Sequence, residues 1–443
     1  MSVLSVRSAA HEASDRIALI CGDETWTWAE VAGEVEAELS RLAEHGLFDQ
    51  ADAGPPRIAF EATSEPRTVF FILALIEAGA TVVPMRHGLT DGERQRQLDM
   101  VQSEVAPIDP ALGSDLLAIL FTSGTTGLPR AIGLSCDAFT AAAAASAARL
   151  DSDGQDRWLC CLPLGHVGGL SILIRSLIAR GTVVLLPRFE PDAAIAAIDR
   201  DEVTLASLVP AMLSRILVEK PDWRPPPTLR AVLLGGSPVT RAAWEQAIER
   251  GIPLRATYGL TETCSQVATA HASSPQELVP LDGTLVRVSD GRIEVAGPTL
   301  GTQLGGSESR TPDGYLRTGD LGNLRADGVL EVIGRADEII ITGGENVSPI
   351  EVEGVLESHP GIARAAVFGH PDEEWGEVVV AALVAHGDRP ESADLVAWCE
   401  SRLASFKRPR RVAFIAELPF TAAGKIDRSS LARVTRGHLW PIS

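Results

Sequence analysis

Several features that mark other protein classes are missing from this sequence of 443 residues. Its six cysteines are scattered without a CxxC pair, which disfavours a disulfide framework or a zinc site and favours free thiols in a reducing compartment. No apolar run approaches the ~20 residues that cross a membrane, and the N-terminus has no apolar signal core. The sequence therefore predicts a cytoplasmic protein without a membrane segment.

Positive charge is also scarce, because 39 Lys and Arg residues face 59 Asp and Glu residues, a net charge of −20. Nucleic acids and anionic membranes bind basic surfaces, so neither is expected as a partner. We expect small-molecule partners instead, with any anion held at a local basic site. The sequence leaves open whether the chain forms a homo-oligomer.

The length exceeds what one hydrophobic core usually organises. Short β-branched runs alternate with Ala-rich helical stretches, which predicts an α/β fold whose mainly parallel sheets are flanked by helices. Strands are expected at residues 57–60, 116–121, 182–186, 205–209 and 231–234, and helices at 69–78, 137–150, 191–200 and 241–250.

The pattern changes after Gly297, where Gly and Asp turns separate short strands and predict a β-rich, hairpin-containing subdomain. A smaller α/β unit is expected after that. Its helices are predicted at residues 349–358 and 393–404, and its strands at 365–368, 378–384 and 412–415. We therefore predict two domains, residues 1–335 and 336–443.

A loop rich in Ser, Thr and Gly follows the strand expected at residues 116–121. It consists of Thr122, Ser123, Gly124, Thr125, Thr126 and Gly127, and Arg130 lies just beyond it. Glycine allows a close backbone approach, hydroxyls and N–H groups donate to phosphate oxygens, and Arg supplies a cation. The pattern differs from a Walker A loop, and a short strand at residues 131–134 is expected next instead of a helix. The loop predicts a phosphate site; the alternative is a solvated connector.

Five further segments follow it along the chain, namely residues 257–263 (Thr-Tyr-Gly-Leu-Thr-Glu-Thr), 316–320 (Leu-Arg-Thr-Gly-Asp), 334–338, 343–351 and 424–428. In this order and at these separations they resemble the acyl-adenylate-forming superfamily, which includes acyl-CoA synthetases, adenylation domains of peptide synthetases and luciferases. The resemblance covers nearly the whole chain from about residue 116 onward.

The resemblance implies an ATP-dependent, AMP-forming ligase of the acid–thiol class. The carboxylate of an acid attacks the α-phosphate of ATP, with Mg²⁺ as cofactor, and gives an acyl-adenylate and pyrophosphate. A small, mobile C-terminal domain then rotates about a hinge, and the thiol of coenzyme A, the co-substrate, attacks the activated carbonyl and releases AMP. Positioning and charge neutralisation dominate such phosphoryl chemistry.

The same resemblance implies roles for individual residues. Catalytic roles fall on Thr261 at the α-phosphate, Glu262 as the Mg²⁺ ligand, and Lys425 between the acid and the α-phosphate. Nucleotide binding falls on the loop from Thr122 to Gly127 with Arg130, and on Gly235, Gly236, Ser237, Tyr258, Asp320 and Arg335. Asp337 is the expected hinge, and Gly343 and Gly344 line the pantetheine tunnel. Lys407 and Arg408 either contact the phosphates of coenzyme A or form a solvated surface. One departure is Pro129-Arg130-Ala131, where the family usually has Pro-Lys-Gly.

The segment of residues 162–176 bears on the acid. Its Arg175 lies nine positions after His166 in a largely apolar run, as in the o-succinylbenzoate–CoA ligases of menaquinone biosynthesis, where that Arg meets the second carboxylate of the substrate. Residues 263–269 are similar to the same ligases. We expect His166, Ser171, Arg175 and Ser265 to line the acid site and o-succinylbenzoate to be the acid. The alternatives are an internal ion pair of Arg175, another acyl- or aryl-CoA synthetase, an enzyme that loads a carrier protein, and an inactive adenylate-binding module.

Overall fold

The computed structural model describes residues 2–46, 55–102, 116–123, 129–304, 310–420 and 426–442, and four sheets organise them. The largest sheet has the strand order β12-β11-β10-β9-β7-β8-β1-β2. Neighbours from β11 to β1 run parallel, whereas the edge strands β12 and β2 are antiparallel. In chain order these strands are β1 (Ile17–Cys21), β2 (Glu24–Thr27), β7 (Arg157–Cys160), β8 (Thr182–Leu185), β9 (Leu205–Leu208), β10 (Ala231–Leu234), β11 (Leu254–Leu260) and β12 (Ser265–Thr269).

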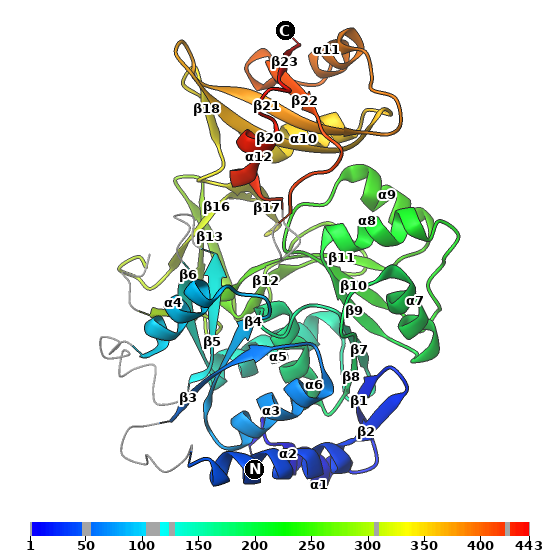
Figure 1. The fold of residues 1–443 in the computed structure, drawn as a ribbon, viewed down its shortest axis with the longest axis vertical. Helices are drawn as coiled ribbons and strands as arrows, with labels where there is room; N and C mark the ends of the chain where they lie inside the picture. The colour runs from blue at the N-terminus through cyan, green and yellow to red at the C-terminus, as the bar shows by residue number, and fades with distance from the viewer. Residues whose placement is uncertain are drawn as a thin grey trace.

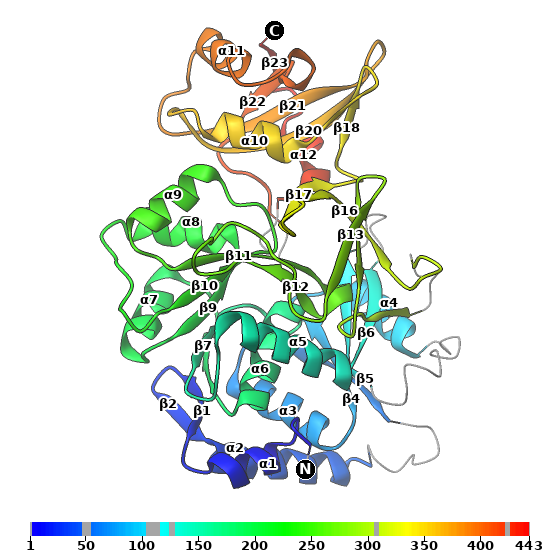
Figure 2. The same ribbon diagram turned by 180° about the vertical axis from the view of Figure 1, so that it is seen from behind.

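Helices cover both faces of this sheet because successive side chains of a strand point to opposite sides. Trp158 and Cys160 of β7 join a core with α5 (Cys136–Leu150) and α6 (Val167–Ala179). Leu159 and Cys161 point the other way, into a core with α7 (Pro191–Arg200), α8 (Pro210–Glu219) and α9 (Arg241–Glu249). Figure 2 shows α5 and α6 beside the sheet and α7 to α9 at its outer side.

A second sheet has the order β15-β6-β5-β4-β3, with β3, β4 and β5 parallel. Its strands are β3 (Arg57–Ala62), β4 (Thr81–Arg86), β5 (Leu116–Ser123), β6 (Pro129–Ser135) and β15 (Thr302–Leu304). One face shares the core of α5 and α6, together with α1 (Val6–Ala13), α2 (Trp28–Glu44) and α3 (Pro66–Glu77), and the other packs on α4 (Asp91–Gln102). The helical layer between the two sheets is the main core.

The β-rich subdomain is an antiparallel sheet of β13 (Leu285–Ser289), β14 (Arg292–Ala296), β16 (Leu316–Leu324) and β17 (Leu330–Arg335). Our prediction placed its start after Gly297, which was too late. β13 and β14 form a hairpin through Asp290-Gly291, both at positive φ. An Asp-Gly pair between alternating apolar residues is typical of a β-hairpin, so the sequence contained a signal for it.

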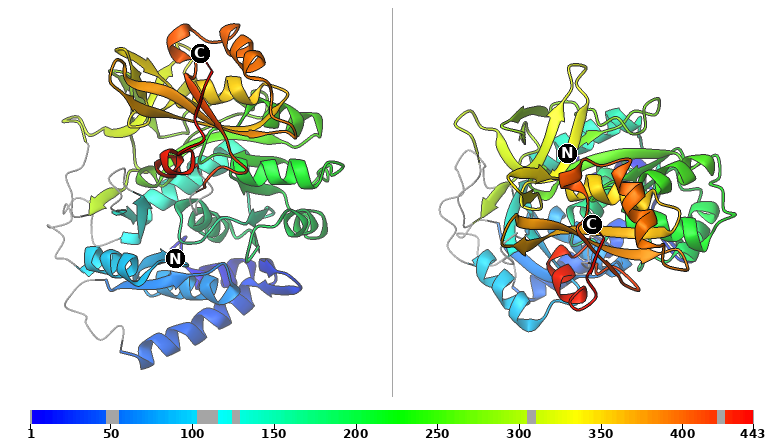
Figure 3. Two further views of the ribbon diagram at one scale, coloured as in Figure 1. Left: turned by 45° about the horizontal axis from the view of Figure 1, so that its top comes forward. Right: turned by 90° about the horizontal axis from the view of Figure 1, so that it is seen from above.

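The C-terminal sheet gathers at one end of the molecule, opposite the N-terminus (Figure 1 and Figure 3). It contains β18 (Ile340–Thr342), β19 (Glu345–Val347), β20 (Ile362–Asp372), β21 (Gly376–Ala385), β22 (Arg411–Phe414) and β23 (Trp440–Pro441), with α10 (Pro349–Glu357), α11 (Ser392–Glu400) and α12 (Arg428–Val434). The helix predicted for residues 393–404 ends at Glu400, and beyond it Arg408 Nε donates to the carbonyl of Leu403 at 3.0 Å. The α/β class is as predicted. The division at 335/336 falls between β17 and β18, and the mobility of the smaller part stays a prediction.

No helix in the described part of the chain is long and apolar enough to cross a membrane.

Glu357, the last residue of α10, gives the C-terminal unit a predicted pH dependence. Its side chain is buried, with Ala365 N donating to it at 2.9 Å, and burial raises its pKa from 4.5 to about 7. A carboxyl whose pKa is higher when folded binds more protons in the folded state, so stability falls as pH rises through 7. The shift corresponds to roughly 3 kcal/mol, lost progressively between pH 4.5 and pH 7. Glu357→Gln should therefore raise the melting temperature at pH 8 and leave it nearly unchanged at pH 5. An equal effect at both pH values would contradict this.

Candidate functional site

Thr122 and Arg130 face each other across β5 and β6, so their side chains share one face of the sheet. Thr122 Oγ1 and Arg130 Nε are buried, and neither has a hydrogen-bond partner among the described residues. Arg130 Nη2 lies 3.3 Å from Glu262 Oε1. The rest of the predicted phosphate loop, from Gly124 through Thr125 and Thr126 to Gly127, lies outside the described residues, as do the side chain of Ser123 and all of Lys425.

Glu262 is held beside β6 by the sharp turn after β11. Gly259 permits this turn, because a Cβ there would lie 1.6 Å from Ser265 O. The chain then forms a short 3-10 helix, η3 (Thr261–Thr263), and enters β12 through Cys264 and Ser265, both at positive φ. Glu262 O accepts a hydrogen bond from Gly301 N at 2.8 Å. Glu262 is thus fixed next to Arg130, and the roles of Thr261 and Glu262 at the phosphates stay predictions.

The fit of Mg²⁺ rests on this one carboxylate. No group of three or more His, Cys, Asp or Glu side chains that could hold a metal occurs among the described residues. Mg²⁺ commonly takes one or two carboxylates and completes its shell with waters and substrate phosphates. Glu262, beside the candidate phosphate site, suits that mode of binding, in which the metal arrives with the nucleotide.

The residues predicted for adenine and ribose come together from three elements. Tyr258 OH of β11 donates to Asp320 Oδ2 of β16 at 2.6 Å, although they are 62 residues apart in sequence. Burial and the neighbouring Asp320 raise the pKa of Tyr258, which stays a neutral donor. Arg335 of β17 is the cross-strand neighbour of Asp320, with Nη1 3.5 Å from Oδ1. Each carboxylate oxygen keeps a lone pair for a ribose hydroxyl.

Gly235 follows β10 directly, with Gly236 and Ser237 after it. Its backbone lies so close to Thr257, the residue before Tyr258, that a Cβ would be 2.6 Å from Thr257 O. The loop of Gly235 to Ser237 therefore lies beside the backbone that carries Tyr258. Arg335 also reaches beyond the subdomain, because its Nε contacts Asp337 Oδ1 at 3.0 Å. The candidate ribose site and the predicted hinge thus share one guanidinium.

Of the four residues predicted for coenzyme A, the two cations are each paired with a carboxylate. Lys407 Nζ lies 2.7 Å from both carboxylate oxygens of Glu351, and Arg408 Nη1 lies 3.2 Å from Glu400 Oε1. Both cations thus have an acidic partner in this structure, and their contact with coenzyme A stays a prediction. Gly343 and Gly344 form the turn between β18 and β19.

Sequence reasoning indicated the basic cluster of residues 407–411 but missed Trp375, which lies beside the Gly343–Gly344 turn. Gly343 N donates to the carbonyl of Trp375 at 2.9 Å, and the Arg410 guanidinium lies 4.1 Å from the centroid of the Trp375 ring. Arg410 belongs to the basic cluster of residues 407–411, and no carboxylate partner for it occurs among the described residues. The basic cluster was visible in the sequence, but Trp375, the stacking partner of Arg410 35 positions away, was not.

The acid-site candidates lie along α6 and the start of β12. His166 immediately precedes α6, and Ser171 and Arg175 follow four residues apart on one face. Arg175 is 7 % exposed, and its Nε and Nη2 have no hydrogen-bond partner in the described structure, nor does Ser171 Oγ. Arg175 contacts the Trp158 ring and lies close enough to Cys264 to influence the pKa of that thiol. Burial lowers the pKa of Arg175 to about 10, so the group is still a cation at neutral pH.

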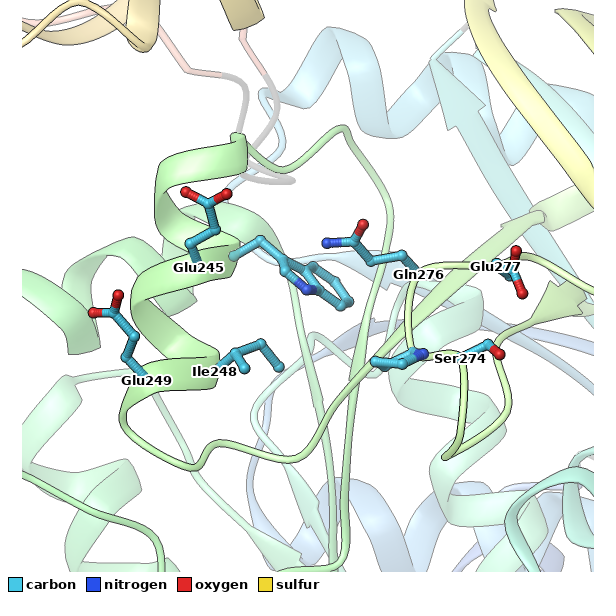
Figure 4. Close-up of a pocket in the computed structure, with 8 residues that line it drawn as sticks. Glu245, Ile248, Glu249, Ser274, Gln276 and Glu277 are labelled. Carbon is cyan, nitrogen blue, oxygen red and sulfur yellow. The ribbon is translucent and has the colours of Figure 1, made fainter.

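One cavity reaches Arg175, and another lies elsewhere. One of about 370 Å³ opens between α5, α6 and residues 152–158, and Arg175 and Trp158 line it; it lies at the amino end of β7, away from His166. Another of about 670 Å³ lies between α9 and a turn, and Figure 4 shows its lining of Trp244, Glu245, Ile248, Glu249, Ser274, Pro275, Gln276 and Glu277. The larger cavity contains no candidate site residue, and its three carboxylates disfavour anionic ligands, so we assign it no part in the chemistry.

Comparison with known proteins decides the family. The model of the AMP-binding enzyme matches residues 6–112 and 101–301, and the model of the AMP-binding enzyme C-terminal domain matches residues 351–425. The 2-succinylbenzoate–CoA ligase of Bacillus pumilus (strain SAFR-032) is 33% identical over 473 aligned positions, covering 95% of this chain and 96% of the relative. The chain belongs to the AMP-binding enzyme family.

Solved structures of this AMP-binding family agree. The o-succinylbenzoate CoA synthetase of Bacillus subtilis in complex with its acyl-adenylate intermediate is 31% identical and superposes with a TM-score of 0.84 over 96% of this chain and 97% of that one. The same synthetase with ATP and a magnesium ion gives a TM-score of 0.85, covering 96% and 98%. The predicted family, and a fold with a large N-terminal and a small C-terminal part, are confirmed.

Proposed function

We propose that this AMP-binding enzyme is an acid–thiol ligase that converts 2-succinylbenzoate, ATP and coenzyme A into 2-succinylbenzoyl-CoA, AMP and pyrophosphate. Relatives of that name align over nearly their whole length. A related structure carries the acyl-adenylate, and another carries ATP with magnesium. A cytosolic location and a place in menaquinone biosynthesis belong to the same proposal.

The observation that carries the choice of acid is the buried Arg175. A guanidinium taken out of water without a counter-charge is costly, so an internal carboxylate is the ordinary solution. None of the described carboxylates supplies it. A dicarboxylic acid does, with one carboxylate held bidentately by Arg175 and the other activated. Ser171, one turn earlier on α6, adds an unpaired buried hydroxyl on the same face.

The chain's own residues then have distinct tasks in adenylation. Tyr258, with Asp320 and Arg335, orients the nucleoside. Arg130 neutralises charge on the pyrophosphate that leaves and Thr122 donates a hydrogen bond to it, while Thr261 hydrogen-bonds the α-phosphate. Mg²⁺, when bound at Glu262, supplies further charge neutralisation at the phosphates.

Lys425, on the family resemblance, places a compact cation between the acid's carboxylate and the α-phosphate. It belongs to the predicted C-terminal domain of residues 336–443, which we propose is mobile about Asp337. The Arg335–Asp337 contact supports a hinge that responds to the nucleotide site.

For the second step, we place the pantetheine arm of coenzyme A at Gly343 and Gly344. Its nucleotide end would lie toward the basic cluster that contains Lys407 and Arg408. The stack of Arg410 on Trp375 beside the glycine turn supports a broader site than the sequence indicated. Arg guanidinium and an indole ring together suit both phosphate and an adenine base.

Exchange of labelled pyrophosphate into ATP tests the acid specificity. We expect exchange with 2-succinylbenzoate at least a hundredfold faster than with benzoate or malonate, the latter two testing an aryl-CoA and a malonate-type ligase. Equal exchange with benzoate would remove Arg175 as the reason for the specificity. A product assay with free coenzyme A and with a carrier protein distinguishes a CoA ligase from an enzyme that loads a carrier protein.

A further inference from the structure

The two charged side chains that the proposed function assigns to the triphosphate and to Mg²⁺ contact each other in the ligand-free chain. Arg130 Nη2 lies 3.3 Å from Glu262 Oε1, with side chains 39% and 19% exposed. Arg130 Nε, on the same guanidinium, has no partner among the described residues, and neither does Thr122 Oγ1 across the strand pair. Nε and Nη2 lie on the same edge of the guanidinium, so Glu262 occupies only part of that edge and Nε keeps a free donor within the described structure.

The backbone around this pair holds it in place. Gly301 N donates to Glu262 O at 2.8 Å, and the next residue begins β15, which pairs with β6 at Thr302 and Gly133. Ala131, where the family usually has Gly, is fully buried in β6. Glu262 and Arg130 are thus anchored through the same sheet, so their contact does not depend on a flexible loop.

We propose that Glu262 is a metal-dependent gate on Arg130 and makes the enzyme select metal-complexed ATP over free ATP. A nucleotide without a divalent cation must compete with the carboxylate for Arg130 and bring its own negative charge towards that carboxylate. When the nucleotide arrives with a cation, Glu262 exchanges one positive partner for another, and Arg130 is released to the phosphates. The gate rests on the proposed function and assigns a specificity role to a contact within the chain.

A simpler effect must be separated from the gate. The charge of Glu262 repels any triphosphate, whether or not it holds Arg130. Simple repulsion acts in the same way when Arg130 is absent, whereas the gate acts through Arg130 alone. A double-mutant cycle of the two residues therefore distinguishes them.

The experiment is calorimetric titration of ATP and of pyrophosphate, both in EDTA, into the wild type, Glu262→Gln, Arg130→Gln and the double variant. We expect Glu262→Gln to raise the affinity for metal-free ATP about fivefold, which is the upper range for a partly exposed ion pair. The same variant should lower the affinity for ATP with Mg²⁺. In the Arg130→Gln background only simple repulsion remains, so the same change should tighten metal-free binding by clearly less. Equal tightening in both backgrounds, or no tightening in the single variant, would overturn the gate.

AMP, which lacks the β- and γ-phosphates, is the control ligand, because its affinity should be unchanged in all four proteins and reports intact folding. Failure of the wild type to bind ATP with Mg²⁺ would count against the proposed function itself. Normal adenylation by the wild type with unchanged metal-free affinity in Glu262→Gln would count against the gate alone.

Discussion

Arg175→Met should raise the KM for 2-succinylbenzoate by at least about thirtyfold, because a buried charge pair that loses one partner costs roughly 2–5 kcal/mol. The effect should be confined to the acid, with the KM for ATP unchanged. It should also disappear for a monocarboxylate analogue that lacks the held carboxylate. In the ligand-free protein the melting temperature should stay level or rise, since the variant removes an uncompensated guanidinium.

Arg180 provides the matched control, because it is as buried as Arg175, lies at the end of the same helix and has a carboxylate partner. Its Nε lies 3.0 Å from Glu12 Oε2, and Nη1 donates to the carbonyl of Val3 at 2.8 Å. Arg180→Met should lower the melting temperature and leave the KM for the acid unchanged. If both variants destabilise the protein and neither alters the KM for the acid, Arg175 is a structural residue.

Lys425→Ala should slow adenylation by about a thousandfold, or ~4 kcal/mol of transition-state stabilisation, and leave thioester formation from supplied acyl-adenylate largely intact. The composition supports a specific role for this lysine, because only three of the 39 basic residues are lysines, namely Lys220, Lys407 and Lys425. A chain that has Arg even in the phosphate loop keeps Lys at the position where a compact point charge is needed.

Two further variants make the Lys425 test specific. Lys425→Arg retains the charge but not the compact geometry, so it should restore little adenylation. Lys220→Ala removes a lysine that pairs with Asp192, far from the candidate site, and should leave both half-reactions unchanged. Equal loss of the two half-reactions in Lys425→Ala would contradict the assigned role.

Local patterns in the sequence were enough for most elements of the α/β fold. Strand and helix periodicity placed β10 and α7 at their observed bounds, and the order of the motifs led to the family. Contacts between residues far apart in the chain could not be predicted from these local patterns. The hairpin at Asp290-Gly291 is an exception, because its Asp-Gly turn signal is local and was nevertheless missed.

The same distinction between local patterns and long-range contacts holds for the candidate site. Residue types at Tyr258 and Asp320 could be predicted from motifs, but their hydrogen bond depends on the packing of β11 against β16. The sequence also left open whether an internal acid pairs with Arg175. That question depends on the position of every carboxylate in the fold, which no local pattern encodes. The contact between Arg130 and Glu262, 132 positions apart, is of the same kind.

The most direct test of the proposed function is product analysis with purified protein, ATP, Mg²⁺, free coenzyme A and 2-succinylbenzoate. The account predicts 2-succinylbenzoyl-CoA, identified by mass, with one AMP and one pyrophosphate per thioester. If the protein binds AMP yet forms neither adenylate nor thioester from this or any other acid in the panel, it is an inactive adenylate-binding module and the account is wrong.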